Sequence, residues 1–463
     1  MSNEGQTDEP KLTTNLKGHA VNIYINRTLS AALAALLAAC GGGSSDSPVS
    51  PASSFSVGGS VSQLTALKSL VLSNNGGDNV TVSANGTFTF PTKVASGASY
   101  AVTVGTQPVG MTCGVTNGTG TATANVVNVA VTCYKNPGFV YVTNYVARIV
   151  SEYSVNPVTG AMTSVGSIAT GAGAHGVAVD PTNKFAYVTN VIDGTVSAYT
   201  ISSSTGVLTS AGAAVPTGTS PYSVAVDPSG KFAYVANQGS NTVSAYTINS
   251  TTGVLTSIGA IPAGTGPYGV TVDPTGKFAY VVNLGSNNVS AYTINSTTGV
   301  LTFVASVVAG LGADGVTVDP TGKFAYVTND SDNNVSAYNV NPSTGALTPA
   351  GTVFPAGTNP HNLAIDPTGK FAYVSNNGSS DISMYTIDAT TGALTPIGSN
   401  ISTTAARPNS LAIDSTGRFA IVLTNNSTVI TYTIDSTTGA LTPTGSSVNT
   451  NSPPFGIAIT SVP

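Results

Sequence analysis

The sequence predicts an all-β protein built mainly from one repeated unit. Only 7% of the 463 residues are charged, and β-branched residues and turn formers are abundant. The phrase FAYV, or a close variant of it, recurs at spacings of 46 to 48 residues and begins at Phe139, Phe185, Phe232, Phe278, Phe324, Phe371 and Phe419. Each repeat holds four short strand-like segments, such as GVAVD, KFAYVTN, TVSAYTI and VLTSAGA. Seven repeats of this length and content predict a seven-bladed β-propeller.

The N-terminal part predicts export and lipid anchoring. Residues 1–39 end in the apolar segment SAALAALLAA, which is too short to span a bilayer and is typical of a secretory signal peptide. Its last residues and the next, LAAC, resemble the lipobox of bacterial lipoproteins, so we expect lipidation of Cys40. Residues 40–54 are rich in Gly, Ser and Pro and form a flexible tether. Gly41 favours an outer-membrane lipoprotein of the cell envelope, facing the periplasm or the surface.

Residues 55–135 predict a small, immunoglobulin-like β-sandwich. About seven short alternating segments are separated by turn signals such as NNGGD and NGTG. Because an exported domain can form disulfides, we expect Cys113 and Cys133 to pair. No combination of residues in this segment suggests chemistry, and we expect it to act as a spacer.

Residues 136–463 predict the propeller, and the order of their strands predicts that the ring closes. The repeat at Phe139 has no GVAVD-like strand before it, whereas the C-terminus ends in an unpartnered FGIAIT. A final strand over 456–461 would complete the first blade and leave no free edge.

The repeats distinguish residues that build the fold from residues that could form a functional site. The phrase DPTGK, or a variant, joins the first and second strands of six repeats, as at Asp180 to Lys184, and its Asp, Pro and Gly suit a tight turn. A residue that recurs in every blade is expected to have a structural role in the blade. Function should therefore lie where equivalent positions differ.

The variable position is the residue just before each first strand. Around the ring it is His175, Tyr222, Tyr268, Asp314, His361, Asn409 and Phe455. If the first strand is innermost, these side chains meet at the mouth of the central channel. Arg407, Arg148, Asp330 and Asp332 lie in loops near this mouth. We predict His361 as a general base, Asp314 as its orienting partner, His175 across the channel and Arg407 on an oxyanion or carboxylate. Tyr222, Tyr268, Asn409 and Arg148 are predicted ligand contacts, and Asp and His side chains at the mouth would also suit a divalent metal.

The repeats DPTGKFAYVTN and YTINSTTGVLT resemble those of lactonase-type seven-bladed propellers and their YVTN-repeat relatives. The resemblance covers residues 136–463 and implies the propeller fold, with lactone hydrolysis by polar residues at the channel mouth. In that family a histidine follows a proline ahead of a first strand, and Pro360–His361 matches this pattern.

Two functions follow from the sequence. The first is hydrolysis of a lactone, and the alternative is a non-catalytic propeller that displays a binding site for a small molecule, an envelope polymer or a protein. A net charge of −5 without a basic cluster excludes nucleic acid as a partner, and we expect a monomer anchored to a membrane through Cys40.

Overall fold

The computed structural model describes residues 53–136, 138–351, 353–404 and 406–460, and every regular element in them is a β-strand. None of these residues forms a helix that is long and apolar enough to cross a membrane. The predicted signal peptide, Cys40 and the tether as far as Ala52 lie outside the described residues.

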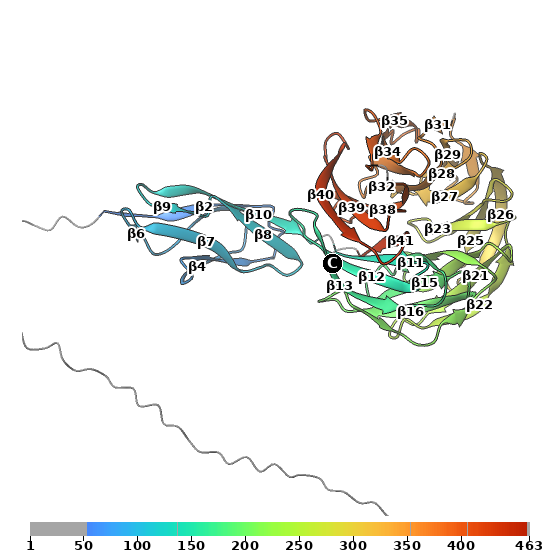
Figure 1. Ribbon diagram of the computed structural model, residues 1–463, viewed down its shortest axis with the longest axis horizontal. Coiled ribbons are helices and arrows are strands. Elements are labelled where there is room, and N and C mark those ends of the chain that lie inside the picture. The colour runs from blue at the N-terminus through green and yellow to red at the C-terminus, as the bar shows by residue number, and fades with distance from the viewer. Residues whose placement is uncertain (1–52, 137, 352, 405, 461–463) are drawn as a thin grey trace, which may run out of the picture. The chain divides into compact units, whose positions relative to one another are not determined.

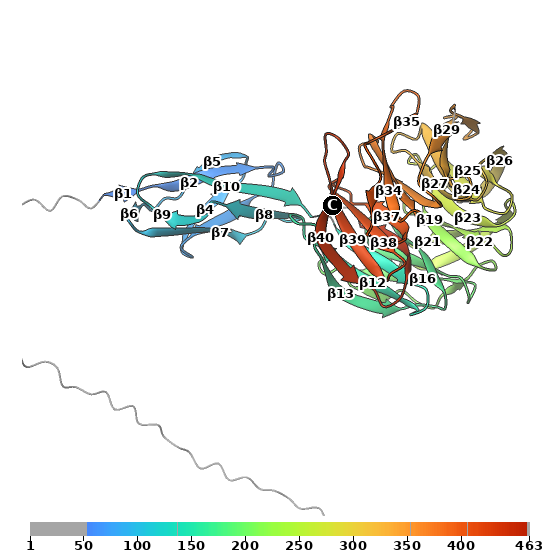
Figure 2. The same ribbon diagram turned by 45° about the horizontal axis from the view of Figure 1, so that its top comes forward.

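The N-terminal strands form two four-stranded sheets that share one hydrophobic core (Figure 1 and Figure 2). One sheet has the order β5 (Gly86–Thr89), β2 (Val57–Ser62), β10 (Val126–Lys135), β8 (Met111–Thr116). The other has the order β4 (Asp78–Val82), β3 (Leu70–Asn74), β7 (Ser99–Thr106), β9 (Thr119–Thr121). The short strands β1 (Ser54–Phe55) and β6 (Val94–Ala95) form a separate pair. The sequence indicated about seven strands, and the additional ones are only two or three residues long.

The predicted disulfide between Cys113 and Cys133 is present. The two residues face each other across the antiparallel pair of β8 and β10. The disulfide therefore joins neighbouring strands of one sheet, and both cysteines are buried in the core that the two sheets share.

The rest of the chain forms seven sheets arranged as blades around a ring (Figure 1). Blade 1 consists of β11 (Phe139–Asn144), β12 (Ile149–Val155), β13 (Met162–Ala169) and β41 (Pro454–Ile459). Blade 2 consists of β14 (Ala174–Val179), β15 (Phe185–Asn190), β16 (Thr195–Ile201), β17 (Leu208–Ser210) and β18 (Val215–Pro216). Blade 3 consists of β19 (Pro221–Val226), β20 (Phe232–Asn237), β21 (Thr242–Ile248) and β22 (Leu255–Pro262).

The remaining blades repeat this order. Blade 4 consists of β23 (Pro267–Val272), β24 (Phe278–Asn283), β25 (Asn288–Ile294) and β26 (Leu301–Val308). Blade 5 consists of β27 (Ala313–Val318), β28 (Phe324–Asn329), β29 (Asn334–Val340), β30 (Leu347–Pro349) and β31 (Phe354–Pro355). Blade 6 consists of β32 (Pro360–Ile365), β33 (Phe371–Asn376), β34 (Asp381–Ile387), β35 (Leu394–Pro396) and β36 (Ile401–Ser402). Blade 7 consists of β37 (Pro408–Ile413), β38 (Phe419–Thr424), β39 (Thr428–Ile434) and β40 (Leu441–Asn449).

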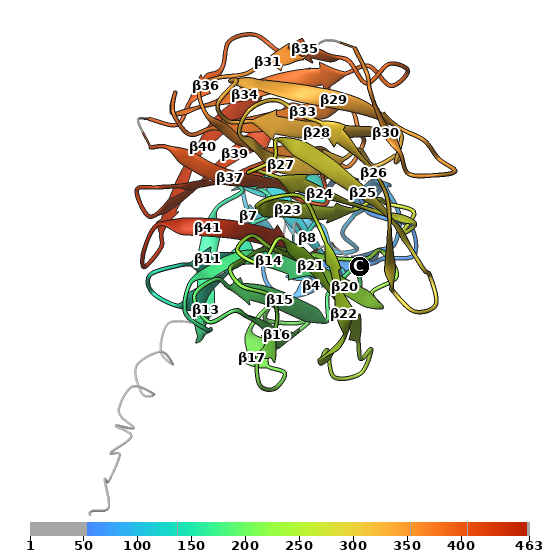
Figure 3. The same cartoon turned by 90° about the vertical axis from the view of Figure 1, so that its right-hand side faces the viewer.

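The C-terminal strand closes the ring, as the order of the repeats predicts. Strand β41 pairs antiparallel with β11, with Ile457 opposite Val142 and Ile459 opposite Val140 (Figure 3). The strand runs from Pro454 to Ile459 rather than over 456–461, because its pairing with β11 already begins at Pro454. The first strands of successive blades contact one another all the way around and are therefore innermost.

Neighbouring blades are joined by a large-on-small packing of their second strands. Phe185 and Tyr187 of blade 2 pack in one buried cluster with Ala233 and Val235 of blade 3. The Tyr187 hydroxyl also donates a hydrogen bond of 3.0 Å to the carbonyl of Gly253, in the last turn of blade 3. Gly253 has a φ of +73°, and a Cβ there would collide with the Phe185 ring. This turn of the repeat therefore requires glycine.

The aspartate of each DPTGK turn organises that turn through hydrogen bonds. In blade 4, Asp273 Oδ1 accepts from the backbone N–H groups of Lys277 (2.8 Å) and Phe278 (2.7 Å). Its Oδ2 accepts from the N–H of Thr275 at 3.1 Å and from the hydroxyl of the same residue. Asp273 is buried, whereas Lys277 is exposed. The carboxylate is thus part of the scaffold.

We predict that Asp273→Ala lowers the free energy of unfolding of the propeller by about 3 kcal/mol, because it leaves four donors without their charged acceptor. Lys277→Ala changes an exposed side chain in the same turn and should shift that free energy by less than about 0.5 kcal/mol. Denaturant titration followed by tyrosine fluorescence measures both values. Equal effects of the two substitutions would contradict the structural role of the aspartate.

Candidate functional site

A cavity of about 220 Å³ lies where the seven innermost strands begin. Its lining includes the second residue of every inner strand: Phe455, His175, Tyr222, Tyr268, Asp314, His361 and Asn409. In each inner strand the pairing with the second strand is irregular at this point, as between Pro360 and Asn362. Such a β-bulge re-aims a side chain. The variable residues therefore face the channel, as the sequence predicts.

The seven lining residues at these positions fall into two groups, one aromatic and one polar. Blades 1 to 4 supply Phe455, His175, Tyr222 and Tyr268, which are all aromatic. Blades 5 to 7 supply Asp314, His361 and Asn409, which are all polar. The cavity thus has an aromatic arc opposite a polar arc.

His175 belongs structurally to the aromatic arc. Its ring centroid lies 4.7 Å from that of Tyr222, 5.0 Å from that of Phe455 and 5.9 Å from that of Tyr268. Its Nδ1 lies 3.0 Å from the Tyr222 carbonyl oxygen, which can only accept, so Nδ1 carries the proton. Burial lowers the pKa of His175 to about 4, although this hydrogen bond opposes the shift. His175 is therefore a neutral wall residue at neutral pH, and the structure gives it no carboxylate partner among the described residues for acid–base work.

The polar arc places His361 between the side chains of two aspartates, Asp314 and Asp330. Its Nε2 lies 3.1 Å from Asp330 Oδ2, and its Nδ1 lies 3.8 Å from Asp314 Oδ2. Asn359 Nδ2 donates to Asp330 Oδ1 at 2.9 Å and holds that carboxylate in place. The Thr328 hydroxyl donates to the His361 carbonyl at 2.8 Å and fixes the backbone. Asp330, rather than the predicted Asp314, is thus the hydrogen-bonded partner of His361.

Burial shifts the pKa values of the two titratable side chains in the polar arc that line the cavity, Asp314 and His361. Asp314 is only 8% exposed, and burial, reinforced by the charge of Asp330, raises its pKa well above the usual range. Burial also lowers the pKa of His361, and the charge and hydrogen bond of Asp330 oppose that shift. An imidazole of lowered pKa beside a carboxyl group of raised pKa suits a pair in which one group takes a proton and the other gives one.

Three predicted contacts do not serve the cavity as expected. Arg407 and Arg148 are exposed and are absent from the residues that line it. Asn409 lines it, but its Nδ2 donates to the Pro454 carbonyl at 3.0 Å and to Asn425. Because its Oδ1 also accepts from Asn377 at 2.8 Å, this amide mainly joins blade 7 to its neighbours.

Asp330 occupies a second position that varies between the blades and that the sequence also shows. It directly follows the second strand of blade 5, and the equivalent residues of the other blades also differ: Tyr145, Val191, Gln238, Leu284, Asn377 and Asn425. This is a second variable ring. By contrast, Asp332 accepts from the Leu311 N–H at 2.8 Å, as Asp193 accepts from Ala172 in blade 2, and so belongs to the scaffold.

The same cluster offers ligands for a metal ion. Atoms of Asp314, Asp330 and His361 lie within 4.8 Å of one another. Two carboxylates and an imidazole suit a divalent cation. A cation there would occupy a nitrogen of His361 and would compete with its use as a base.

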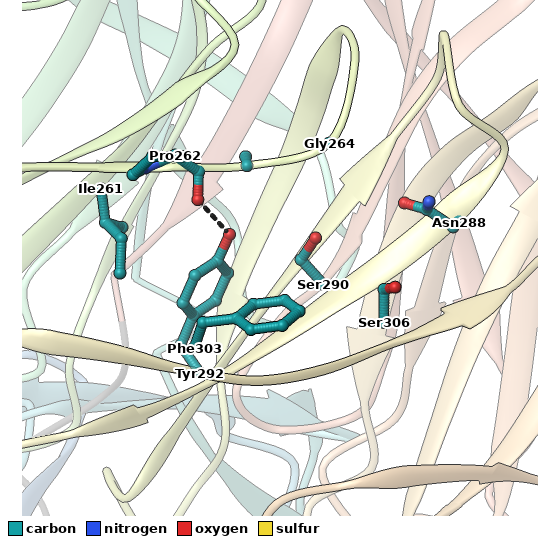
Figure 4. A pocket seen from close by; sticks show the side chains of 9 residues that line it. Ile261, Pro262, Gly264, Asn288, Ser290, Tyr292, Phe303 and Ser306 are labelled. Carbon is teal, nitrogen blue, oxygen red and sulfur yellow. Dashed lines mark hydrogen bonds between the residues drawn. The ribbon is translucent and has the colours of Figure 1, made fainter.

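A second cavity, of about 390 Å³, lies away from the channel along the outer strands of blades 3 and 4 (Figure 4). Tyr292 donates its hydroxyl to the Pro262 carbonyl at 2.9 Å there, and the exposed Phe303 packs against the Tyr292 ring. No acid, base or other charged group is among the described residues that line this cavity, and we therefore place the candidate site at the channel.

The family model described as lactonase, seven-bladed β-propeller, matches residues 131–270 and 264–455. The chain belongs to this lactonase family. A search of curated protein sequences gave no match.

Solved structures support the propeller fold of this lactonase-family chain. A "putative 6-phosphogluconolactonase" from Bacteroides uniformis aligns with a TM-score of 0.63 and 18% identity, over 69% of this chain and 98% of the other. The periplasmic gluconolactonase of Pseudomonas aeruginosa aligns with a TM-score of 0.61 and 18% identity, over 70% of this chain and 99% of the other. At such identities the likeness shows the fold alone.

We predict that His175 makes the propeller less stable in mild acid. The unfolded chain takes up a proton at this histidine near pH 6.5, and the folded chain only near pH 4. Between these values the unfolded state binds more protons, so stability is full above about pH 6.5 and falls as the pH is lowered toward 4. His175→Gln should therefore lose less melting temperature than the wild type between about pH 7 and about pH 4.5. Calorimetry measures this difference, and an equal loss in both proteins would contradict the lowered pKa of His175 in the folded protein.

Proposed function

We propose that the protein hydrolyses a lactone in the central cavity, with His361 as the general base. The observation that carries this proposal is the position of His361 between Asp330 at 3.1 Å and Asp314 at 3.8 Å, at the wall of the cavity. Membership of the lactonase family supports the choice of reaction.

The geometry suggests how the protons move. If His361 Nε2–H donates to Asp330, Nδ1 keeps its lone pair and can take a proton from water. The water oxygen adds to the lactone carbonyl carbon as that proton leaves. The ring C–O bond then breaks, and the departing ring oxygen takes a proton from Asp314. His361 returns its proton to Asp314, so the net change is lactone plus water to hydroxy acid.

We predict that His361→Ala lowers kcat/KM for lactone opening at least about 100-fold, the usual contribution of a general base. Asp330→Asn should also lower it, because an amide no longer fixes the imidazole with the proton on Nε2. Lys323→Ala, an exposed change on the turn side of blade 5, is the matched control and should leave the rate unchanged. Assays use a panel of lactones, with melting temperatures measured in parallel.

Three outcomes would contradict this proposal. Full activity of His361→Ala would exclude the histidine as the base. Activity that EDTA abolishes and a divalent cation restores would assign the cluster to a metal instead. Binding of lactones by pure wild-type protein without any turnover would favour the alternative, a propeller that binds and displays.

We also propose that the protein is an exported lipoprotein of the cell envelope, anchored to a membrane through Cys40. The lipobox-like LAAC, the following Gly/Ser/Pro segment and the Cys113–Cys133 disulfide support this, because structural disulfides are typical of exported proteins.

We predict that Cys40→Ala moves the protein from the membrane fraction to the soluble fraction of cells, because it removes the thiol that would carry the lipid. Fractionation followed by immunoblotting measures this, with Ser45→Ala in the same segment as the control that should stay with the membrane. A Cys40→Ala protein that remains in the membrane fraction would contradict the anchor.

A further inference from the structure

The central cavity contains negative charge and no permanent cation. Asp314 lines it, and Asp330 adjoins it through His361. No lysine or arginine is present among the described residues that line it.

The cations of the propeller lie elsewhere. Six of them follow the turns at the far ends of the inner strands: Lys184, Lys231, Lys277, Lys323, Lys370 and Arg418. An inner strand of six residues spans roughly 20 Å, which exceeds the screening length of about 10 Å in dilute salt. The other two, Arg148 and Arg407, are exposed and outside the lining. Nothing described in the cavity neutralises an anionic ligand.

The two acidic side chains are gathered at one point of the cavity wall. Carboxylate oxygens of Asp314 and Asp330 and a ring nitrogen of His361 lie within 4.8 Å of one another. A phosphate or carboxylate group on a ligand would meet this charge at short range.

The opposite wall suits an uncharged ring. The Tyr222 and Tyr268 rings lie 4.7 Å apart and, with Phe455, give an apolar surface for the C–H face of a sugar-like ring. Ser223, Asn362 and Ser410 add neutral polar groups to the lining. A volume of about 220 Å³ admits one ring with small substituents.

From these observations we infer that the cavity takes a single-ring, uncharged hydroxylated lactone and rejects phosphorylated lactones, with Asp314 and Asp330 as the residues that set this specificity. The inference rests on the proposed function for the reaction, but its charge selection concerns binding alone. The same charge would repel the carboxylate of the hydroxy-acid product and so favour its release.

The test compares two ligands that cannot be hydrolysed, glucono-1,5-lactam and its 6-phosphate, by calorimetry on the mature protein with EDTA present. We expect the neutral lactam to bind at least about 100-fold more tightly than the phosphate, because like charges at a binding site are strongly unfavourable. The preference should shrink in Asp314→Asn/Asp330→Asn. It should also shrink in the wild type when salt is raised from about 0.05 M to about 0.5 M, which keeps the test valid if the double variant does not fold.

Equal or tighter binding of the phosphate would overturn the inference and leave the hydrolysis proposal standing. A preference for the neutral lactam that does not change when the salt concentration is raised would also overturn the inference, because the selection would then be steric. A preference that reverses on replacing EDTA with a divalent cation would assign the carboxylates to a metal and overturn it as well. Charge-selective binding in a protein that opens no lactone would support the inference and reject hydrolysis.

Discussion

The propeller depends on one repeated contact, in which the aromatic residues of a second strand pack against a glycine turn of the next blade. A tyrosine hydroxyl donates to the glycine carbonyl at six of these joints, as from Tyr326 to Gly392 at 2.9 Å. At the joint between blades 7 and 1, Ile421 stands in place of tyrosine, and Phe419 still packs beside Gly160. This joint involves the blade that β41 completes, so strand pairing closes the ring where the hydroxyl is missing.

This contact limits where the blades can differ in sequence. The second strand, the DPTGK turn and the glycine turn between the third and fourth strands are committed to packing, and their residues hardly vary between blades. The bulged second residue of each inner strand lines the channel and differs from blade to blade, although some of these side chains, such as Asn409, also bond to a neighbouring blade. Variation there divides the mouth into an aromatic arc and a polar arc without loss to the scaffold.

The repeat pattern was enough to predict the fold, the closing strand and the seven variable residues that line the channel mouth: His175, Tyr222, Tyr268, Asp314, His361, Asn409 and Phe455. The repeat pattern did not predict which side chains of different blades contact one another. Asp330 contacts His361 because the loop after β28 of blade 5 reaches over to blade 6, and its spacing in the sequence does not show this. Arg407 lies two residues before Asn409 in the sequence, but its side chain is exposed rather than directed at the cavity.

A crystal structure of the mature protein with glucono-1,5-lactam tests the central claim most directly, namely that function lies where the seven blades differ. We expect the lactam ring in the central cavity, against Tyr222 and Tyr268, with its carbonyl carbon on the side of His361 Nδ1. A lactam bound instead in the outer cavity beside Phe303, with the channel mouth lacking it, would contradict this claim.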